Sequence, residues 1–161
     1  MMFFLFNLKI IEKMKVSKIS EAYGVLASAK INKCLDVEKV AAWKVCHAIK
    51  KVAEDYQEAC RDATSKLNDI EDYEGKMRMA LEYEAKKGDG CEMKADEYKA
   101  FVAEYDRVRG LVDSAVKELG DADVTLDVEG VSEDAFCRLL ASNPDWDMRQ
   151  IEVVSDVIIK A

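Results

Sequence analysis

The chain has 161 residues, 50% of them apolar and 35% charged, and its formal net charge is −8. This length suits one domain, and the apolar content excludes a chain that is disordered by composition. The acidic balance excludes a non-specific nucleic-acid binder, because Lys and Arg contacts to phosphates supply most of that affinity. One proline and seven glycines are few breakers, which favours long helices over a many-turned β fold.

The first six residues, Met1 to Phe6, are apolar but too few to span a membrane, which takes about 20 residues. They lack a basic n-region and a small-residue cleavage site, so a signal peptide is not expected. Residues 12–17 resemble an ordinary protein start. We therefore predict that residues 1–13 are an N-terminal extension and that Met14 is the natural start. The alternative is a helix or strand packed on the core.

Two helix starts follow. Ser17 is a suitable N-cap, and apolar residues at helical spacing predict a helix over residues 17–31. After a short connection, Asp36 is expected to cap a second helix, with Glu38 in the first turn, where acidic groups are favourable.

The second helix carries the strongest pattern. Apolar residues recur at alternating steps of four and three, and Lys66 alone breaks this seam. Such a 3.5-residue repeat is typical of helices packed as in coiled coils. Because residues 36–86 contain no proline, we predict one continuous helix of roughly 70 Å. The seam consists of Val45, Ile49, Val52, Tyr56, Ala59, Ala63, Lys66, Ile70, Tyr73, Met77 and Ala80.

A glycine turn separates this helix from a third one. Gly88 and Gly90 are expected to end the second helix, because glycine adopts the left-handed conformation readily. A matching seam then runs from Tyr98 to Leu119. Residues 14–120 are thus predicted to form a long antiparallel, coiled-coil-like helical hairpin with a short N-terminal helix. In this hairpin, Tyr73 should face Tyr105 and Ile70 should face Val108.

Residues 121–161 are predicted to form a small strand–helix module packed on the same domain. Residues 123–128 alternate between polar and apolar as a short strand does. Ser132 is expected to cap a helix over residues 133–141.

The final apolar stretch, residues 148–159, follows a helix-start signal. Asp147 and Gln150 have the spacing of a capping box, which predicts a helix. The stretch is also rich in β-branched residues, which suit a strand, so both readings stay open at this point.

Signals for catalysis are weak. His47 is the only histidine, so a His-based zinc site lacks ligands. Cys46 and His47 point about 100° apart on a helix, which disfavours a nucleophile–base pair. Phosphate-loop, dinucleotide-binding, serine-hydrolase and metalloprotease motifs do not occur in the sequence. The acidic run from Asp121 to Asp134 has oxygen ligands for a hard cation but is typical of a solvated face. We expect no enzyme, no metal site and no cofactor.

One face of the second helix gathers an indole, an imidazole and several ammonium groups. Stacking and charge would let these groups hold a nucleobase and its phosphates. The alternative is that the indole packs on the first helix and the lysines are solvated. The candidate ligand- or partner-binding residues are Trp43, Lys44, His47, Lys50 and Lys51.

Apolar residues off the seam predict association. The first helix and the C-terminal module are too short to cover both ends of the second helix, which leaves Met79 and Leu81 exposed. Exposed apolar patches usually mark association sites, and two-fold symmetry is the commonest solution. We therefore expect a homo-oligomer. Five cysteines, an odd number at irregular spacing without a C-x-x-C pair, indicate reduced thiols in a cytoplasm.

Residues 14–26 (MKVSKISEAYGVL), the charged helix pair, and residues 124–136 (VTLDVEGVSEDAF) carry a resemblance to a known group of proteins. In these parts the chain resembles a family of small helical proteins of unknown function encoded by phages and prophages. The resemblance covers most of the chain from Met14 onward. The extra N-terminus and the long tail after Asn143 depart from it. It implies a viral accessory setting in the cytoplasm of a host bacterial cell.

Two functions suit that setting. The first is a non-enzymatic phage accessory protein that counters host defence by sequestering a host protein or a small anionic nucleotide signal. The alternative is an oligomeric structural or assembly protein of a phage particle. The first predicts a concave site with converging Trp, His and Lys side chains, and the second predicts a long exposed apolar surface. In neither do we expect binding to a membrane or to non-specific nucleic acid.

Overall fold

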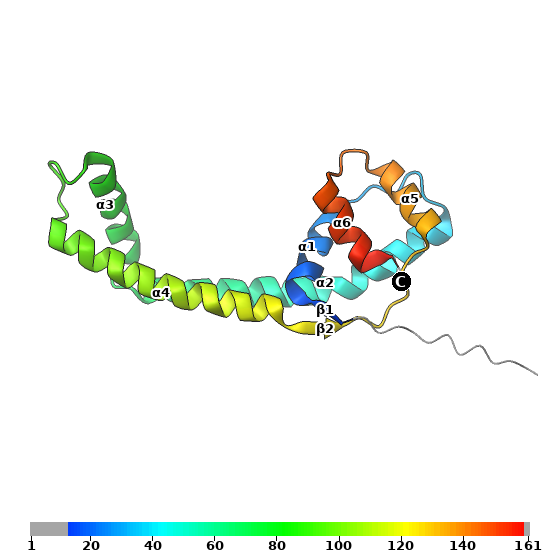
Figure 1. The fold of residues 1–161 in the computed structure, drawn as a ribbon, viewed down its shortest axis with the longest axis horizontal. Helices are drawn as coiled ribbons and strands as arrows, with labels where there is room; N and C mark the ends of the chain where they lie inside the picture. Colours follow the sequence, from blue (N-terminus) through cyan, green and yellow to red (C-terminus); the bar gives the residue numbers. More distant parts are fainter. Residues whose placement is uncertain (1–12, 160–161) are drawn as a thin grey trace, which may run out of the picture. The chain divides into compact units, whose positions relative to one another are not determined.

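The computed structural model describes residues 13–159, and this part of the chain is mainly helical, as predicted (Figure 1). Two short strands pair with each other, and no described helix combines the length and apolar content needed to cross a bilayer. The elements in chain order are β1 Lys13–Lys15, α1 Val16–Leu26, α2 Asp36–Thr64, the 3-10 helix η1 Ser65–Asp69, α3 Tyr73–Lys86, α4 Ala95–Asp121, β2 Asp123–Thr125, α5 Glu133–Ser142 and α6 Met148–Ile158.

The contacts divide the described chain into two compact units. The first unit contains the residues up to Gln57 together with those from Gly120 onward, and the second contains Glu58–Leu119. The first unit thus combines β1, α1, most of α2, β2, α5 and α6. The domain boundaries expected from the sequence stay a prediction.

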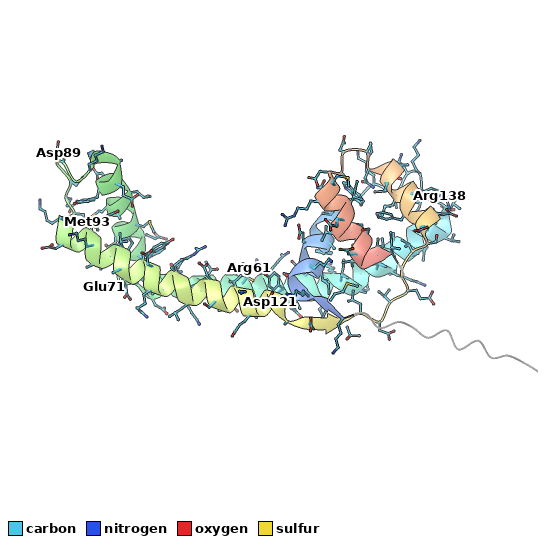
Figure 2. All side chains as sticks on the ribbon, in the orientation of Figure 1. Arg61, Glu71, Asp89, Met93, Asp121 and Arg138 are labelled. Carbon is cyan, nitrogen blue, oxygen red and sulfur yellow. The ribbon has the colours of Figure 1, made fainter. Side chains whose placement is uncertain are left out.

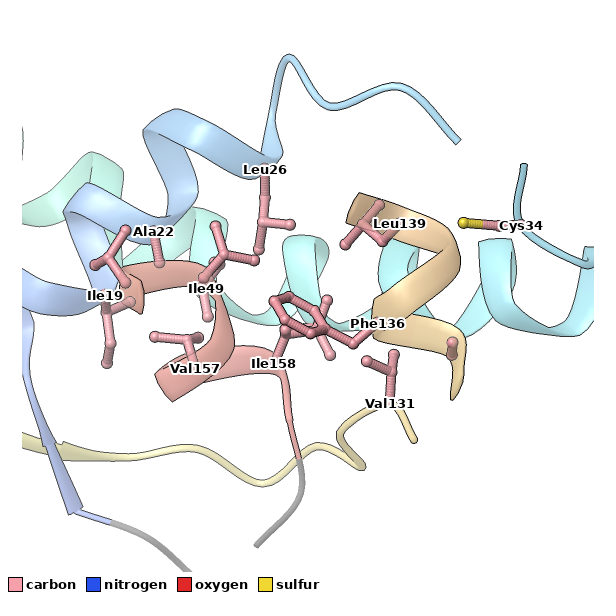
Figure 3. Close-up of a cluster of buried hydrophobic side chains, with 14 residues drawn as sticks. Ile19, Ala22, Leu26, Cys34, Ile49, Val131, Phe136, Leu139, Val157 and Ile158 are labelled. Carbon is pink, nitrogen blue, oxygen red and sulfur yellow. The ribbon is translucent and has the colours of Figure 1, made fainter. Parts of the chain in front are cut away.

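The core of the first unit is built by the apolar faces of α1, α2, α5 and α6 (Figure 3). Each helix buries residues three or four apart, which is the spacing that places side chains on one helical face. The buried members include Ile19, Ala22 and Leu26 of α1; Val45 and Ile49 of α2; Phe136 and Leu139 of α5; and Val154, Val157 and Ile158 of α6.

Local capping signals fix the last two helices as predicted. Ser132 caps α5, and its Oγ accepts a hydrogen bond from the Ala135 N–H at 3.2 Å. Asp147 and Gln150 form the complete capping box of α6, with bonds of 2.8 and 2.9 Å. The final stretch is therefore a helix, because these caps satisfy two of its free N–H groups and its β-branched side chains are buried.

The two strands form a small antiparallel pair in the first unit. Met14 faces Val124, and both side chains pack partly against the core. The predicted strand does begin at Asp123, but it ends at Thr125, which pairs with Lys13. A strand at its partner, β1, was expected only as the alternative for residues 1–13. It includes Lys13, while residues 1–12 of the predicted extension lie outside the described part of the chain.

The prediction for the first helix is wrong at both ends. Ser17 lies inside α1, and the N-cap position belongs to Lys15, whose side chain makes no capping bond. The helix ends at Leu26 rather than at residue 31. Beyond it, the backbone of Lys30 bonds to the side chain of Asn143 instead of continuing the helical ladder.

The predicted continuous helix over residues 36–86 is also wrong, because α2 ends at Thr64. The hydroxyl of Thr64 donates to the Cys60 carbonyl at 2.8 Å, and that of Ser65 donates to the Asp62 carbonyl at 2.6 Å. Side chains that bond to nearby backbone in this way favour helix ends over helix interiors. The chain then tightens into η1, which is typical of a helix terminus.

A residue in the left-handed backbone conformation follows η1 and separates it from α3. Asp72 has φ 49°, a conformation that short polar side chains tolerate better than others. Its carboxylate lies against Gly75, where an added Cβ would come within 2.5 Å of the Asp72 Oδ2. The 3.5-residue seam continues across this break, which is why the sequence did not reveal it.

The second unit has its own core on η1, α3 and α4. Its glycine turn behaves as predicted: α3 ends at Lys86, and Lys87, Gly88 and Gly90 all have positive φ. The buried members of this core are Leu67, Ile70, Ala80, Met93, Phe101, Val108 and Val112.

Two pairs of tyrosines join α3 to α4 within this unit. Tyr73 and Tyr105 stack with ring centroids 6.4 Å apart, and Tyr83 and Tyr98 stack at 4.3 Å. The Tyr98 hydroxyl also donates to the Glu84 carboxylate at 2.7 Å. Through these contacts, residues early in α4 lie against the end of α3, and residues further along α4 lie against its beginning.

The apolar surface expected near the end of the second helix is present in part. Leu81 is 58% exposed, whereas Met79 packs partly against the second core.

Candidate partner-binding face

The candidate residues lie in the first half of α2, on the side that faces away from the core. Val45 and Ile49 are fully buried on the opposite side of the same helix. Since successive helical residues are 100° apart, positions 37, 40, 44 and 47 fall on the outer side. We call Val37, Val40, Trp43, Lys44 and His47 the Trp43 face.

The Trp43 face is apolar and open to solvent. Val37 is 75% exposed, Val40 is 51% exposed and Trp43 is 62% exposed. A tryptophan is normally a buried or interface residue, because its ring removes a large apolar area from water. The alternative in which Trp43 packs on the first helix therefore does not describe this structure.

Trp43 and His47 form a stacked pair. Their ring centroids are 5.3 Å apart and their planes are 17° from parallel. The stack lies along the outer surface of a single helix, since the residues are one turn apart. This arrangement places an indole and an imidazole beside each other on the exposed side of the helix.

The lysines of the predicted site divide into two kinds. Lys50 and Lys51 pair with carboxylates one turn later, at 3.8 Å to Glu54 and 2.8 Å to Asp55. Lys44 is in no ion pair with a described residue. The structure thus brings Trp43 and His47 together and places Lys44 beside them as a positive charge open to a partner.

A buried carboxylate fixes the start of α2. The side chain of Glu38 is 9% exposed, and its oxygens accept from the Arg138 Nε at 2.7 and 2.9 Å (Figure 2). One of these oxygens also accepts from the Leu35 N–H at 3.0 Å. The hydrogen bond from Arg138 holds the pKa of Glu38 below its ordinary value, and burial opposes it less strongly. The pair anchors α2 to α5 and so holds the Trp43 face in place.

A second set of hydrogen bonds, centred on Asn143, holds the loop that leads into α2, and we call it the Asn143 clasp. Asn143 is buried and pairs with Lys30 in both directions, accepting from its N–H at 2.7 Å and donating to its carbonyl at 2.8 Å. It also donates to the Leu139 carbonyl at 2.9 Å. The Lys33 N–H donates to the Ser142 hydroxyl at 2.9 Å. These hydrogen bonds satisfy backbone groups of the loop that would otherwise be paired within a helix or a sheet.

Neither anchor was predicted from the sequence. The sequence pattern indicates only a favourable first-turn position for Glu38, and it assigns no structural role to Asn143. The partners of Glu38 and Asn143 lie 100 and 113 residues away, so no local spacing reveals them.

The structure does not place Cys46 and His47 so that the imidazole could act as a base for the thiol. Cys46 is half-buried against the first core, while the His47 ring stacks on Trp43. Burial raises the pKa of the Cys46 thiol, and the charge of Lys50 lowers it by less. The protonated thiol is a weak nucleophile.

The second unit carries a shallow pocket at the helix break. The hydroxyls of Thr64 and Ser65 are already bonded to backbone carbonyls, and the other polar side chains of the lining are those of Arg61, Asn68 and Tyr73. The complete lining consists of Cys60, Arg61, Thr64, Ser65, Leu67, Asn68 and Tyr73. Within residues 13–159, no group of three or more His, Cys, Asp or Glu side chains is arranged to hold a metal ion.

Comparison of the chain with protein-family models, curated proteins and solved structures gave no match. The function is therefore inferred from the residues and contacts of this chain.

The anchoring of α2 is expected to depend on pH. Because the folded-state pKa of Glu38 is lowered from 4.5, the pair stabilises the fold above that pH, and the stabilisation is lost as the pH falls through the folded-state pKa. Glu38→Gln should therefore melt below the wild type at pH 7, and the difference should shrink in acid. Glu129→Gln, at an exposed position, is the control. A difference that stays constant from pH 7 down to about pH 3 would contradict this role.

Proposed function

We propose that this protein works by binding another protein through the Trp43 face. The single observation that carries the proposal is the exposure of Trp43 together with Val37 and Val40 on one side of α2. Tryptophan anchors often dominate the energy of interfaces, because their large rings bury much area for little loss of side-chain entropy.

The surroundings of the face support a protein partner over a free nucleotide. The Trp43–His47 stack lies on the outside of one helix, and two valines extend it along the helix axis. A nucleotide site is normally concave and encloses its ligand. An amphipathic surface with anchors at helical spacing is instead what a helix presents to a groove or to another helix.

The rigid placement of the face also supports binding. Glu38–Arg138 and the Asn143 clasp fix the start of α2 and the loop before it. A surface that is already ordered loses less conformational entropy on association, which favours affinity.

We propose in addition that α3 and α4 form an antiparallel hairpin that follows the sequence seams. The Tyr73–Tyr105 and Tyr83–Tyr98 stacks support this arrangement. Exposed apolar surface favours the assembly-protein alternative over sequestration of a nucleotide. The viral setting stays a prediction that rests on the resemblance.

A photo-crosslinking amino acid with an aromatic side chain, placed at position 43 so that an aromatic anchor is kept there, tests the proposal in cells that express the protein. The expected result is a discrete crosslinked species, because a specific partner covers this position. Adding Val40→Glu should remove it, since a charge in an apolar contact is costly. The same crosslinker at Leu111, which is exposed and apolar but lies in the second unit, is the matched control. No discrete product from position 43 would refute the proposal.

A further inference from the structure

On the side of α2 that carries the Trp43 face, apolar and charged residues are placed symmetrically about Val40. Val40 lies at its centre, Val37 lies three residues before it and Trp43 three residues after it. Asp36 and Lys44 lie four residues before and after the same centre. At 100° per residue, these five positions fall within an arc of about 120° on one side of α2.

Two identical helices that pack antiparallel about Val40 would match this pattern. In such a pair, positions whose numbers sum to 80 meet across the two-fold axis. Val37 then contacts Trp43 of the second copy, and Asp36 lies beside Lys44 of the second copy. Each contact occurs twice, so an apolar centre is flanked by two pairs of opposite charge.

The charges at the two ends are available for such contacts. The Asp36 side chain is 100% exposed, and the ammonium of Lys39 lies 3.5 Å from it within the same helix. Lys44 is in no ion pair with a described residue. A parallel arrangement would place Asp36 against Asp36 and Lys44 against Lys44, and like charges in contact are destabilising. Charge complementarity therefore selects the antiparallel pair.

We propose that the partner of the Trp43 face is a second copy of this chain, docked antiparallel through α2 with the two-fold axis at Val40. The proposal rests on the function proposed above and names its partner. The helix axes would lie about 8–10 Å apart, as in other packed helices. Because the contact covers only about three turns of helix, the dimer should dissociate on dilution.

Charge reversal with the purified full chain tests the geometry. Sedimentation should show a concentration-dependent dimer for the wild type. Asp36→Lys alone and Lys44→Asp alone should each be monomeric at the same concentration, because each creates two like-charge contacts. An equimolar mixture of the two variants should dimerise again, since Lys at 36 then meets Asp at 44, and Lys44 meets Asp36. Trp43→Ala should weaken the dimer about tenfold or more.

Restored dimerisation in the mixture also shows that both variants are folded. As an independent measurement, Val40→Cys should give a disulfide-linked dimer on mild oxidation, because the two copies of residue 40 meet on the axis. Leu81→Cys, similarly exposed but in the second unit, should not.

A wild-type monomer at every concentration would overturn the proposal. So would a wild-type dimer whose charge-reversed variants fail to dimerise when mixed, or equal crosslinking at positions 40 and 81. A monomer that dimerises only after residues 1–12 are removed would instead assign the face to that segment. Photo-crosslinking from position 43 to a different protein would overturn the second-copy partner while leaving the proposed function intact. No discrete crosslink at all would overturn both.

Discussion

Replacing Ile49 by alanine should destabilise the first unit by about 2–5 kcal/mol, whereas replacing Trp43 by alanine should cost less than about 0.5 kcal/mol. The two residues lie on opposite sides of α2. Ile49 is fully buried, so its removal leaves a cavity, while Trp43 is 62% exposed and loses little contact on truncation. Truncation of a tryptophan to alanine usually destabilises a protein more than truncation of an isoleucine, so the expected order here is the reverse of the usual one.

Trp146 provides the measurement. It packs partly against the core of the first unit and is the only tryptophan left in Trp43→Ala. Its fluorescence in denaturant should therefore report unfolding of this unit in Trp43→Ala, and in the wild type and Ile49→Ala it adds to the signal of the exposed Trp43. Equal losses of stability in the two variants would mean that Trp43 is a core residue.

Asn143→Asp should lower the free energy of unfolding by about 3 kcal/mol despite its nearly unchanged shape. A carboxylate keeps the bond from the Lys30 N–H but cannot donate to the Lys30 and Leu139 carbonyls. Two donated bonds are lost and a charge is left in a buried place, which costs more than either bond alone.

Asn32→Asp is the matched control, because Asn32 lies in the loop that Asn143 holds but is exposed. The melting temperature of Asn143→Asp should fall by roughly 6–12 °C, while that of the control should change little. A similar small change in both would show that the clasp does not hold the loop before α2.

The elements that the sequence predicted well are those with local signals. Ser132, Asp147 and Gln150 act within three residues of the groups that they cap, so their spacing is sufficient. The turn at Gly88 is of the same kind, because glycine is the residue that most readily adopts the positive φ found there.

The break after Thr64 was missed for a physical reason. The apolar seam indicates only which side chains are buried. Those side chains stay buried although the chain passes through a 3-10 helix and a left-handed Asp72, so the seam gives no sign of the break. The local signal was the cluster of Thr, Ser, Asn and Asp side chains, which favour helix ends.

The sequence pattern grouped Trp43, Lys44 and His47 of the Trp43 face, but it did not assign Val37 and Val40 to the site or predict that the face is exposed. The start of α2 is apolar on two sides, with Val45 and Ile49 on one and Val40 and Trp43 on the other. A helix that is apolar on both sides gives no local indication of which one is buried. Contacts from distant residues decide it here, chiefly the Glu38–Arg138 pair that joins residues 100 positions apart.

Quenching of Trp43 fluorescence tests whether the Trp43 face is open in the monomer and covered in the dimer. In a Trp146→Phe variant, Trp43 is the only tryptophan, so a water-soluble quencher reports its exposure alone. We expect strong quenching in dilute solution, protection as the protein concentration rises, and loss of that protection when Val40→Glu is added. Protection from the quencher at the lowest concentration, unchanged by Val40→Glu, would show that Trp43 is ordinary core and would contradict the account.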